Sequence, residues 1–467
     1  MRPATVFLLS ALIIGSLEAK PNIKNFFSKH FFKDVYGTID ANIKVGDAGK
    51  PLILTDLIQQ DQIDEAQAAA EVKLDAFLGV KSYAGYFRVD EIYDSNLFFW
   101  FFPSQSNFEK DPVIVWLQGG PGAPSELGLF GEIGPFDIIG DKLVLRNTSW
   151  TTSSSILFID QPAGTGFSFT NGGYAQNQTK VGDDLYEAIY QFFQLFPVLQ
   201  SNDFFVAGES YGGKYVPALG YTILKKNPTG EIKINLKGLA IGNGLTDPKH
   251  QYKFADYLLQ LGLVDDKERD MLKEIENQVA EKIDNEDWLE ASKLIDDEFD
   301  AIDSTADLAD IHNYLVNYSD FDDFDTDELG DFLRREDIRK AIHVGNTPFQ
   351  KDGNVYANLQ ADIPKSVAPL VAELLEHYRI LVYNGQLDTV VPYSTTVEYL
   401  QNLDFVSAEE YKNAERRKWR YGSDVAGYIK SAGNLTEVLV RNAGHLVPAD
   451  QPEWALDLIN KFMTNNL

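Results

Sequence analysis

The chain has 467 residues and a formal net charge of −29, from 70 acidic and 41 basic side chains. A charge of this sign and size excludes nucleic acids and anionic membrane surfaces as partners, since both attract basic proteins. The chain contains no cysteine, which excludes zinc–thiolate sites and a cysteine nucleophile. We expect neither a metal site nor a cofactor.

Residues 1–19 have the features of a secretory signal peptide. Arg2 precedes an apolar stretch over 4–15, and small residues follow it at Ser16 and Ala19. No later stretch reaches the 18 apolar residues that a spanning helix needs, so no membrane contact is expected. We therefore predict a protein that is secreted or resides in the lysosomal or vacuolar lumen. Four glycosylation sequons agree with that route: Asn147, Asn177, Asn317 and Asn434.

The segment 20–80 is interpreted as a propeptide or an arm, with an amphipathic helix predicted over 56–78. A strand hairpin follows at 82–89 and 97–102. Short apolar runs then predict buried strands, separated by helical stretches such as 183–196. The pattern predicts an α/β fold, with a mixed, mostly parallel sheet and helices on both faces. The further strands are expected at 112–117, 155–160, 203–207, 236–241, 380–383 and 437–440.

Between residues 247 and 342 the strand signal disappears and helical patterns replace it. We interpret this region as a helical cap inserted into a core formed by 81–246 and 343–467. Residues 284–331 contain 18 acidic side chains and a single lysine, Lys293. The run 320–328 lacks the spacing of a calcium loop, so a solvated face or loop is the better interpretation. Such a density of carboxylates suits an acidic compartment.

The pentapeptide Gly208-Glu-Ser-Tyr-Gly212 lies between a predicted strand and a helix-compatible stretch. This order is typical of a nucleophile elbow, in which flanking glycines permit a tight turn that exposes the serine hydroxyl. The same stretch resembles the opening of a phosphate-binding loop up to Lys214. Tyr215 stands where such a loop needs a serine or threonine, so nucleotide binding is not predicted. Lys214 is expected to be a surface or packing residue.

Ser210 needs a general base and a carboxylate that orients this base. Among the six histidines, His445 is the one in a glycine-containing turn after a late strand. The other five are assigned ordinary polar roles: His30, His250, His312, His343 and His377. Asp388 ends the preceding strand and completes the order Ser, Asp, His expected for this fold. A turn-capping role is the alternative for Asp388.

At these residues the chain resembles the serine carboxypeptidases, an α/β-hydrolase family, and in particular their vitellogenic-like branch. The resemblance extends from about residue 49 to the end of the chain. Six motifs carry it: Trp116-Leu-Gln-Gly-Gly-Pro-Gly122, Gly131-Glu-Ile-Gly-Pro135, Asp160-Gln-Pro-Ala-Gly-Thr-Gly-Phe-Ser168, Gly208-Glu-Ser-Tyr-Gly-Gly213, Asn384-Gly-Gln-Leu-Asp388 and Gly444-His-Leu-Val-Pro448. The segments 96–102 and 341–346 resemble the vitellogenic-like branch.

The resemblance implies an enzyme with Ser210 as nucleophile, His445 as general base and Asp388 as its orienting acid. It places the oxyanion hole at the backbone N–H groups of Gly120 and Tyr211. Recognition of the substrate's terminal carboxylate is assigned by the same resemblance to Gln118, Gly119, Glu132 and Glu209.

Glu209 can bind a carboxylate only when it is itself protonated, which requires burial and a neighbouring acid. An acid pH optimum follows from that requirement. A purely structural glutamate beside the elbow is the alternative for Glu209.

The function expected is a serine-type carboxypeptidase, a hydrolase that acts on peptides with a free C-terminal carboxylate. Two alternatives remain. The same triad could serve acyl transfer or ester hydrolysis, and the fold could serve a non-catalytic carrier or protective protein. The sequence leaves open whether the chain forms a homodimer.

Overall fold

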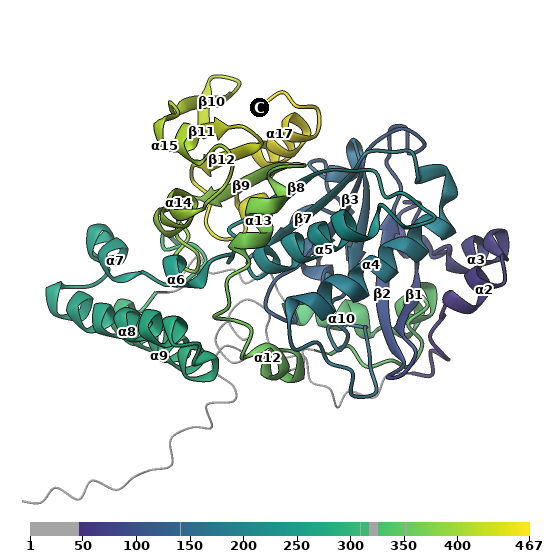
Figure 1. Ribbon diagram of the computed structural model, residues 1–467. Coiled ribbons are helices and arrows are strands. Elements are labelled where there is room, and N and C mark those ends of the chain that lie inside the picture. The colour runs from purple at the N-terminus through teal and green to yellow at the C-terminus, as the bar shows by residue number, and fades with distance from the viewer. Residues whose placement is uncertain (1–45, 141, 309, 317–325, 351–352) are drawn as a thin grey trace, which may run out of the picture.

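The computed structural model describes residues 46–140, 142–308, 310–316, 326–350 and 353–467 (Figure 1). The predicted signal peptide, the sequon at Asn317 and most of the acidic run 320–328 lie outside these residues. No helix among the described residues is both long and apolar enough to cross a bilayer.

A ten-stranded sheet forms the centre of the described chain, in the order β1-β2-β6-β3-β7-β8-β9-β12-β11-β10. The six strands from β6 to β12 are parallel, and antiparallel strands flank them on both sides. The predicted mixed, mostly parallel sheet is confirmed. The strands are β1 (Tyr83–Asp90), β2 (Ser95–Phe102), β3 (Val113–Leu117), β6 (Ser155–Ile159), β7 (Phe204–Glu209), β8 (Leu236–Gly242), β9 (Arg379–Gly385), β10 (Arg417–Tyr421), β11 (Asp424–Ala432) and β12 (Leu435–Val440).

Helices cover both faces of the sheet, which explains the unbroken apolar runs of its strands. In β2, Phe99 and Phe101 belong to the core under α4 and α5, while Phe98, Trp100 and Phe102 belong to the core on the opposite face. Helices α4, α5 and α13 lie together on one face (Figure 1). Among the described residues after β1, the α-helices outside the region 247–342 are α4 (Gln178–Leu195), α5 (Gly212–Lys226), α12 (Gly353–Leu359), α13 (Ala368–Leu374), α14 (Tyr393–Asn402), α15 (Ala408–Asn413), α16 (Val447–Asp450) and α17 (Pro452–Met463).

The prediction of a single helix over 56–78 is wrong, because the chain forms two short helices and a 3-10 turn there. Helices α2 (Thr55–Gln59) and α3 (Ile63–Ala70) are separated at Asp61, whose φ of +58° is left-handed. Glu71 is extended, and a 3-10 turn follows at Asp75–Phe77. Leu54, Ile58, Ala66 and Ala70 are all buried in the core. The part of this segment from Leu54 to Ala70 is therefore packed against the core of the molecule.

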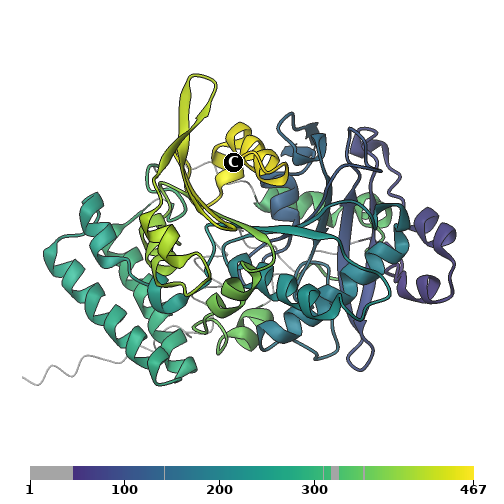
Figure 2. The same cartoon turned by 45° about the horizontal axis from the view of Figure 1, so that its top comes forward.

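Between β8 and β9, all regular elements in the described residues are helices. Helices α8 and α9 pack against each other as a hairpin that projects from the body of the molecule (Figure 2). Asp265 begins α8 with a capping box that it forms with Glu268. The helices described within the region 247–342 are α6 (Pro248–Gln251), α7 (Ala255–Leu261), α8 (Asp266–Asp284), α9 (Trp288–Ala306), α10 (Thr326–Arg334) and α11 (Glu336–Ala341).

Four strands were not predicted from the sequence. β4 (Phe136–Ile139) and β5 (Lys142–Leu145) form a separate two-stranded sheet. β10 and β11 extend the main sheet at one edge and form a long ribbon (Figure 2). In β10 all side chains except that of Trp419 are exposed, so the strand has no apolar run to reveal it.

Candidate active site

The predicted elbow is a sharp turn between β7 and α5. Ser210 has a φ of +60°, a left-handed conformation that a serine adopts only where the surrounding structure enforces it. A Cβ placed on Gly208 would lie 2.6 Å from the carbonyl oxygen of Leu117 in β3. Glycine is therefore required at that position, because the elbow packs directly on the end of the neighbouring strand.

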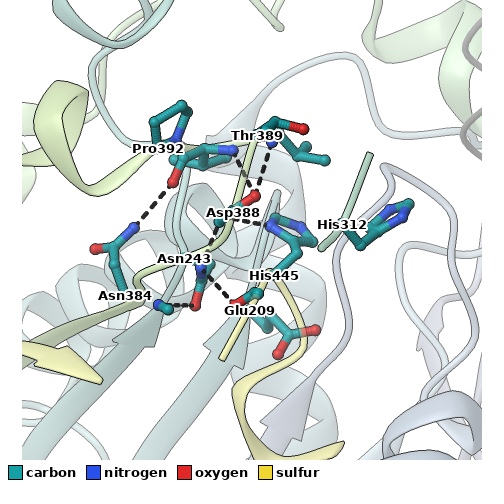
Figure 3. A network of polar contacts seen from close by, with 12 residues as sticks. Glu209, Asn243, His312, Asn384, Asp388, Thr389, Pro392 and His445 are labelled. Atoms are coloured by element: carbon teal, nitrogen blue, oxygen red, sulfur yellow. Dashed lines mark hydrogen bonds and ion pairs between the residues drawn. The ribbon is translucent and has the colours of Figure 1, made fainter. Parts of the chain in front are cut away.

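Asp388 and His445 are brought together behind this edge of the sheet (Figure 3). Asp388 follows β9 and His445 follows β12, two adjacent parallel strands. The Nδ1 atom of His445 lies 2.9 Å from Oδ2 of Asp388, and both side chains are buried. The backbone N–H groups of Val390 and Val391 donate to Oδ1 of the same carboxylate, at 2.7 and 3.1 Å. These bonds hold the carboxylate of Asp388 in place.

Asn243 is a member of this network that the sequence reasoning missed. Its Nδ2 atom donates to Oδ2 of Asp388 at 2.7 Å, and its Oδ1 accepts the N–H of Gly385 at 3.3 Å. Asn243 directly follows β8. A polar residue at the end of a parallel strand is a candidate site residue, so Asn243 could have been predicted from the sequence. Asn243 has a φ of +43° and ties the strand end to the acid.

A pocket beside Ser210 combines residues from distant parts of the chain. Gly120, Pro121, Ser210 and Tyr211 line one side of it. A Cβ on Gly119 would lie 2.6 Å from the backbone nitrogen of Tyr211, so the glycine turn after β3 touches the elbow. The remaining walls are mainly apolar: Leu245, Tyr252, Phe299, Ile363, Val390 and Val391. Two of these, Tyr252 and Phe299, come from the helical region 247–342.

The four residues assigned to carboxylate recognition also meet next to the elbow. Nε2 of Gln118 lies 3.2 Å from Oε1 of Glu132 and 3.2 Å from Oε1 of Glu209. Oε1 of Gln118 accepts the indole N–H of Trp116 at 2.7 Å, which fixes the amide's orientation. Gln118, Glu132 and Glu209 are buried, and Gly119 follows Gln118 in the turn.

Glu132 and Glu209 form a pair of acids with little access to water. Burial raises the pKa of Glu132 to about 7. Burial, followed by the charge of Glu132 and a hydrogen bond with its carboxyl group, raises the pKa of Glu209 well above its usual range. Two carboxyl groups in contact share a proton, because both cannot ionise without water. The pair is therefore protonated in acid and able to donate a hydrogen bond.

A second buried acid pair lies nearby, which the sequence reasoning did not assign. Burial, followed by the charge of Asp160, raises the pKa of Glu126 well above its usual range. Burial raises the pKa of Asp160 to about 6, although it accepts backbone N–H groups from Ser125 at 2.9 Å and Phe167 at 2.7 Å. Glu126 lies between the motifs 116–122 and 131–135 and pairs with Asp160, the first residue of the motif 160–168.

These acids predict that the protein is most stable in acid. Between about pH 4 and pH 7 the native state holds protons that the unfolded chain releases, so stability falls as pH rises. We expect the Tm to decrease by roughly 5 to 10 °C between pH 5 and pH 8. Glu126→Gln should reduce this dependence, and the exposed control Glu65→Gln should leave it unchanged. Differential scanning calorimetry at a series of pH values measures the Tm. The prediction would be contradicted if the Tm changed equally with pH in wild type, Glu126→Gln and Glu65→Gln.

Lys214 is fully buried, so of the two roles expected for it, a surface or a packing residue, the packing role is the correct one. Its Nζ donates to the backbone oxygens of Asp362 and Ile363 and lies 3.4 Å from Oδ2 of Asp362. Burial lowers the pKa of Lys214 to about 8. Because Ile363 lines the pocket, Lys214 anchors one of its walls.

Three of the four predicted sequons lie within the described residues. Asn147 and Asn177 are exposed, and Oδ1 of Asn177 accepts the N–H of Lys180 as the cap of α4. Nδ2 of Asn434 donates to the carbonyl of Leu375 at 2.8 Å. Asn434 is partly buried and its Nδ2 is engaged in that bond, so the exposed Asn147 and Asn177 are the better candidates. Glycosylation stays a prediction.

The sheet order, the elbow and the buried acid–histidine pair define the α/β-hydrolase fold. A family profile described as serine carboxypeptidase matches residues 73–465. The chain belongs to the serine carboxypeptidase family and is a serine-type carboxypeptidase, a hydrolase of peptides.

Three relatives bear the names of carboxypeptidases. The chain is 49% identical to a venom serine carboxypeptidase of Apis mellifera, covering 90% of this chain and 92% of that protein. It is 44% identical to a vitellogenic carboxypeptidase of Aedes aegypti, covering 90% and 91%. It is 42% identical to the probable serine carboxypeptidase CPVL of Homo sapiens, covering 92% and 93%.

A solved structure supports the fold. A prohormone-processing carboxypeptidase from Saccharomyces cerevisiae superposes with a TM-score of 0.75 at 24% identity, covering 85% of this chain and 96% of that one. The predicted fold class and the predicted resemblance are both confirmed. No cluster of three or more metal-ligating side chains occurs within the ranges the structure describes.

Proposed function

We propose that this carboxypeptidase releases C-terminal residues from peptides at acid pH through an acyl-enzyme on Ser210. The observation that carries the proposal is the position of Glu209. It is covalently adjacent to Ser210, fully buried and paired with Glu132, so the nucleophile and a protonated acid stand side by side.

In the first half-reaction, the Ser210 hydroxyl attacks the carbonyl carbon of the last peptide bond, and His445 accepts the hydroxyl proton. The N–H groups of Gly120 and Tyr211 donate to the developing oxyanion. His445 then passes its proton to the leaving amine, and the terminal residue departs. Asp388 orients His445 through the Nδ1 bond and stabilises the imidazolium.

In the second half-reaction, water attacks the acyl-enzyme while His445 accepts its proton. The ester bond to Ser210 breaks, and the shortened peptide leaves with a new terminal carboxylate. The penultimate side chain of the substrate enters the apolar pocket beside Ser210, between Tyr252 and Phe299. The helical region 247–342 acts as a cap by supplying these two aromatic walls.

Specificity for the chain terminus comes from the buried amide and acids. A protonated Glu209 donates to the substrate's terminal carboxylate, assisted by Gln118 and the N–H of Gly119, while Glu132 shares its proton with Glu209. When the pair loses that proton, its charge repels the substrate. Activity on peptides should therefore fall as pH rises past the raised pKa at which the pair loses this shared proton.

An acidic luminal compartment or a secreted acidic fluid fits this chemistry. The surplus of acidic side chains and the buried acid pairs both favour a protein that works below neutral pH. We accordingly place the protein in the secretory pathway, the lysosome or the vacuole, consistent with the signal predicted at 1–19.

The test compares a peptide having a free carboxylate with the matching C-terminal amide, across pH, in wild type and Glu209→Gln. For the wild type we expect kcat/KM on the free acid to drop at least tenfold from pH 5 to pH 8, while the amide keeps its activity. Glu209→Gln cannot ionise, so its activity on the free acid should lose most of that drop. Steady-state kinetics provide the measurement.

The exposed variant Glu65→Gln serves as the matched control and should keep the wild-type profiles. If the wild type gave the same pH profile for both substrates, carboxylate recognition would be refuted. That outcome would favour ester hydrolysis or acyl transfer on the same triad.

A further inference from the structure

A short segment, residues 310–314, touches both loops that carry the proposed catalytic acid and base. The N–H of Thr389, next to Asp388, donates to the carbonyl of Ile311 at 3.3 Å. The N–H of His445 donates to the carbonyl of His312 at 2.7 Å. A Cβ on Gly444 would lie 2.1 Å from that same carbonyl oxygen, so the two loops are in tight contact. The segment thus joins the acid loop to the base loop.

The side chain of His312 lies beside the imidazole of His445 (Figure 3). The two ring centroids are 5.4 Å apart and the planes are tilted by 57°. Nδ1 of His312 lies 2.7 Å from Oδ1 of Asp310, which also accepts the backbone N–H of His312 at 2.8 Å. His312 is only 5% exposed. Two buried acid–histidine pairs, Asp388–His445 and Asp310–His312, therefore stand next to each other.

Four titratable groups lie around His312. They are Asp310 on its own segment, Asp388 and His445 from the two loops, and Asp450 of α16. Burial raises the pKa of Asp310, but the hydrogen bonds and charge of His312 outweigh this, so that the pKa lies below its usual range. Burial raises the pKa of Asp450, which accepts the N–H of Gly444 at 2.6 Å. Asp310 is thus the ionised partner of His312.

A general base in an acid-active enzyme faces a physical conflict. An ordinary histidine is mostly protonated at pH 5 and cannot accept a proton. In general, a carboxylate beside the imidazole strengthens that tendency, because it stabilises the imidazolium. A second positive charge about 5 Å away acts in the opposite direction, since like charges in a poorly solvated site repel strongly.

We propose that Asp310 and His312 form a positioning pair for the general base: the imidazolium of His312, held by Asp310, keeps His445 available as a base in acid. His312 touches neither the substrate nor the reacting atoms and acts through His445. This inference rests on the proposed function, in which His445 is the base and the reaction runs at acid pH.

The experiment measures kcat/KM for a free-acid peptide from pH 4 to pH 7 in wild type, His312→Phe and Asp310→Asn. His312→Phe keeps an aromatic ring but holds no charge, and Asp310→Asn removes the charge that retains the proton. The acid limb is the part of the pH profile in which kcat/KM falls as pH decreases. In both variants we expect the acid limb to move to higher pH by about half to one unit. This corresponds to a loss of roughly three- to tenfold at pH 4.5, with activity near pH 6.5 within threefold of wild type. The exposed histidine variant His377→Phe is the matched control and should show no shift.

A merely structural role would lower activity by the same factor at every pH, and that result would overturn the inference. An acid limb unchanged from wild type would overturn it as well. If circular dichroism shows that His312→Phe does not fold, the isosteric Asp310→Asn decides between the same two results. His445→Ala is included: normal turnover in that variant would refute the proposed function and this inference with it. An inactive His445→Ala together with an unshifted His312→Phe would refute this inference alone.

Discussion

Replacing Ser210 with alanine should lower the rate of peptide hydrolysis by a factor of about 10³ or more. The proposed mechanism has no substitute for the hydroxyl, which forms the bond that carries the acyl group. Alanine retains the Cβ that the left-handed turn at φ +60° already accommodates, so the variant should fold and melt like the wild type. Turnover of a free-acid peptide at pH 5 and covalent labelling by a fluorophosphonate give the measurement.

Ser201→Ala is the matched control, because Ser201 is exposed in a loop before β7 and should be irrelevant to catalysis. The control should label and turn over as the wild type does. If Ser210→Ala kept more than about one thousandth of wild-type activity, another nucleophile would have to be sought.

Replacing Asp388 with asparagine should cost a factor of about 10³ to 10⁴ in kcat. The carboxylate of Asp388 faces four donors: the N–H groups of Val390 and Val391, the amide of Asn243 and Nδ1 of His445. An asparagine has a single acceptor oxygen, so its NH₂ group must face donors on one side. Either the loop loses its bonds to the backbone, or His445 loses the acceptor that sets its tautomer.

Single-turnover kinetics on an activated substrate, together with melting curves, test this expectation. His445→Ala should show a loss of similar size, and combining either change with Ser210→Ala should add little, because the three groups act as a unit. Asp404→Asn makes the same chemical change at an exposed position and should leave both kcat and the Tm unchanged. Normal turnover by His445→Ala would mean that another histidine serves as the base.

The strands that position the site could be predicted because of where they lie. β3, β6 and β7 are buried on both faces, and such strands must be continuously apolar, so their runs stand out from the helices around them. β10 could not be predicted for the opposite reason. It is an edge strand whose side chains are mostly exposed, so it has no continuous apolar run. The prediction of one helix over 56–78 failed because the chain turns at Asp61 with a left-handed φ, and packing of the short pieces into the core outweighs local helix propensity.

The candidate residues Ser210, Asp388 and His445 were recognisable from the chain alone, since each follows a strand and adjacent parallel strands end at one edge. Asn243 obeys the same rule and could have been found. The amino-acid sequence by itself thus determined the α/β class, the elbow and the order of the candidate triad.

Only the tertiary structure decided which polar groups face each other across loops. That His312 lies against His445, that Glu126 meets Asp160 and that Lys214 is buried under Asp362 all depend on how distant segments pack. The protonation states of buried acids such as Glu126 and Asp160 also depend on this packing. A carboxyl group shifts its pKa because neighbours displace water from it, and those neighbours are assembled by the fold rather than by the residues beside it in the chain.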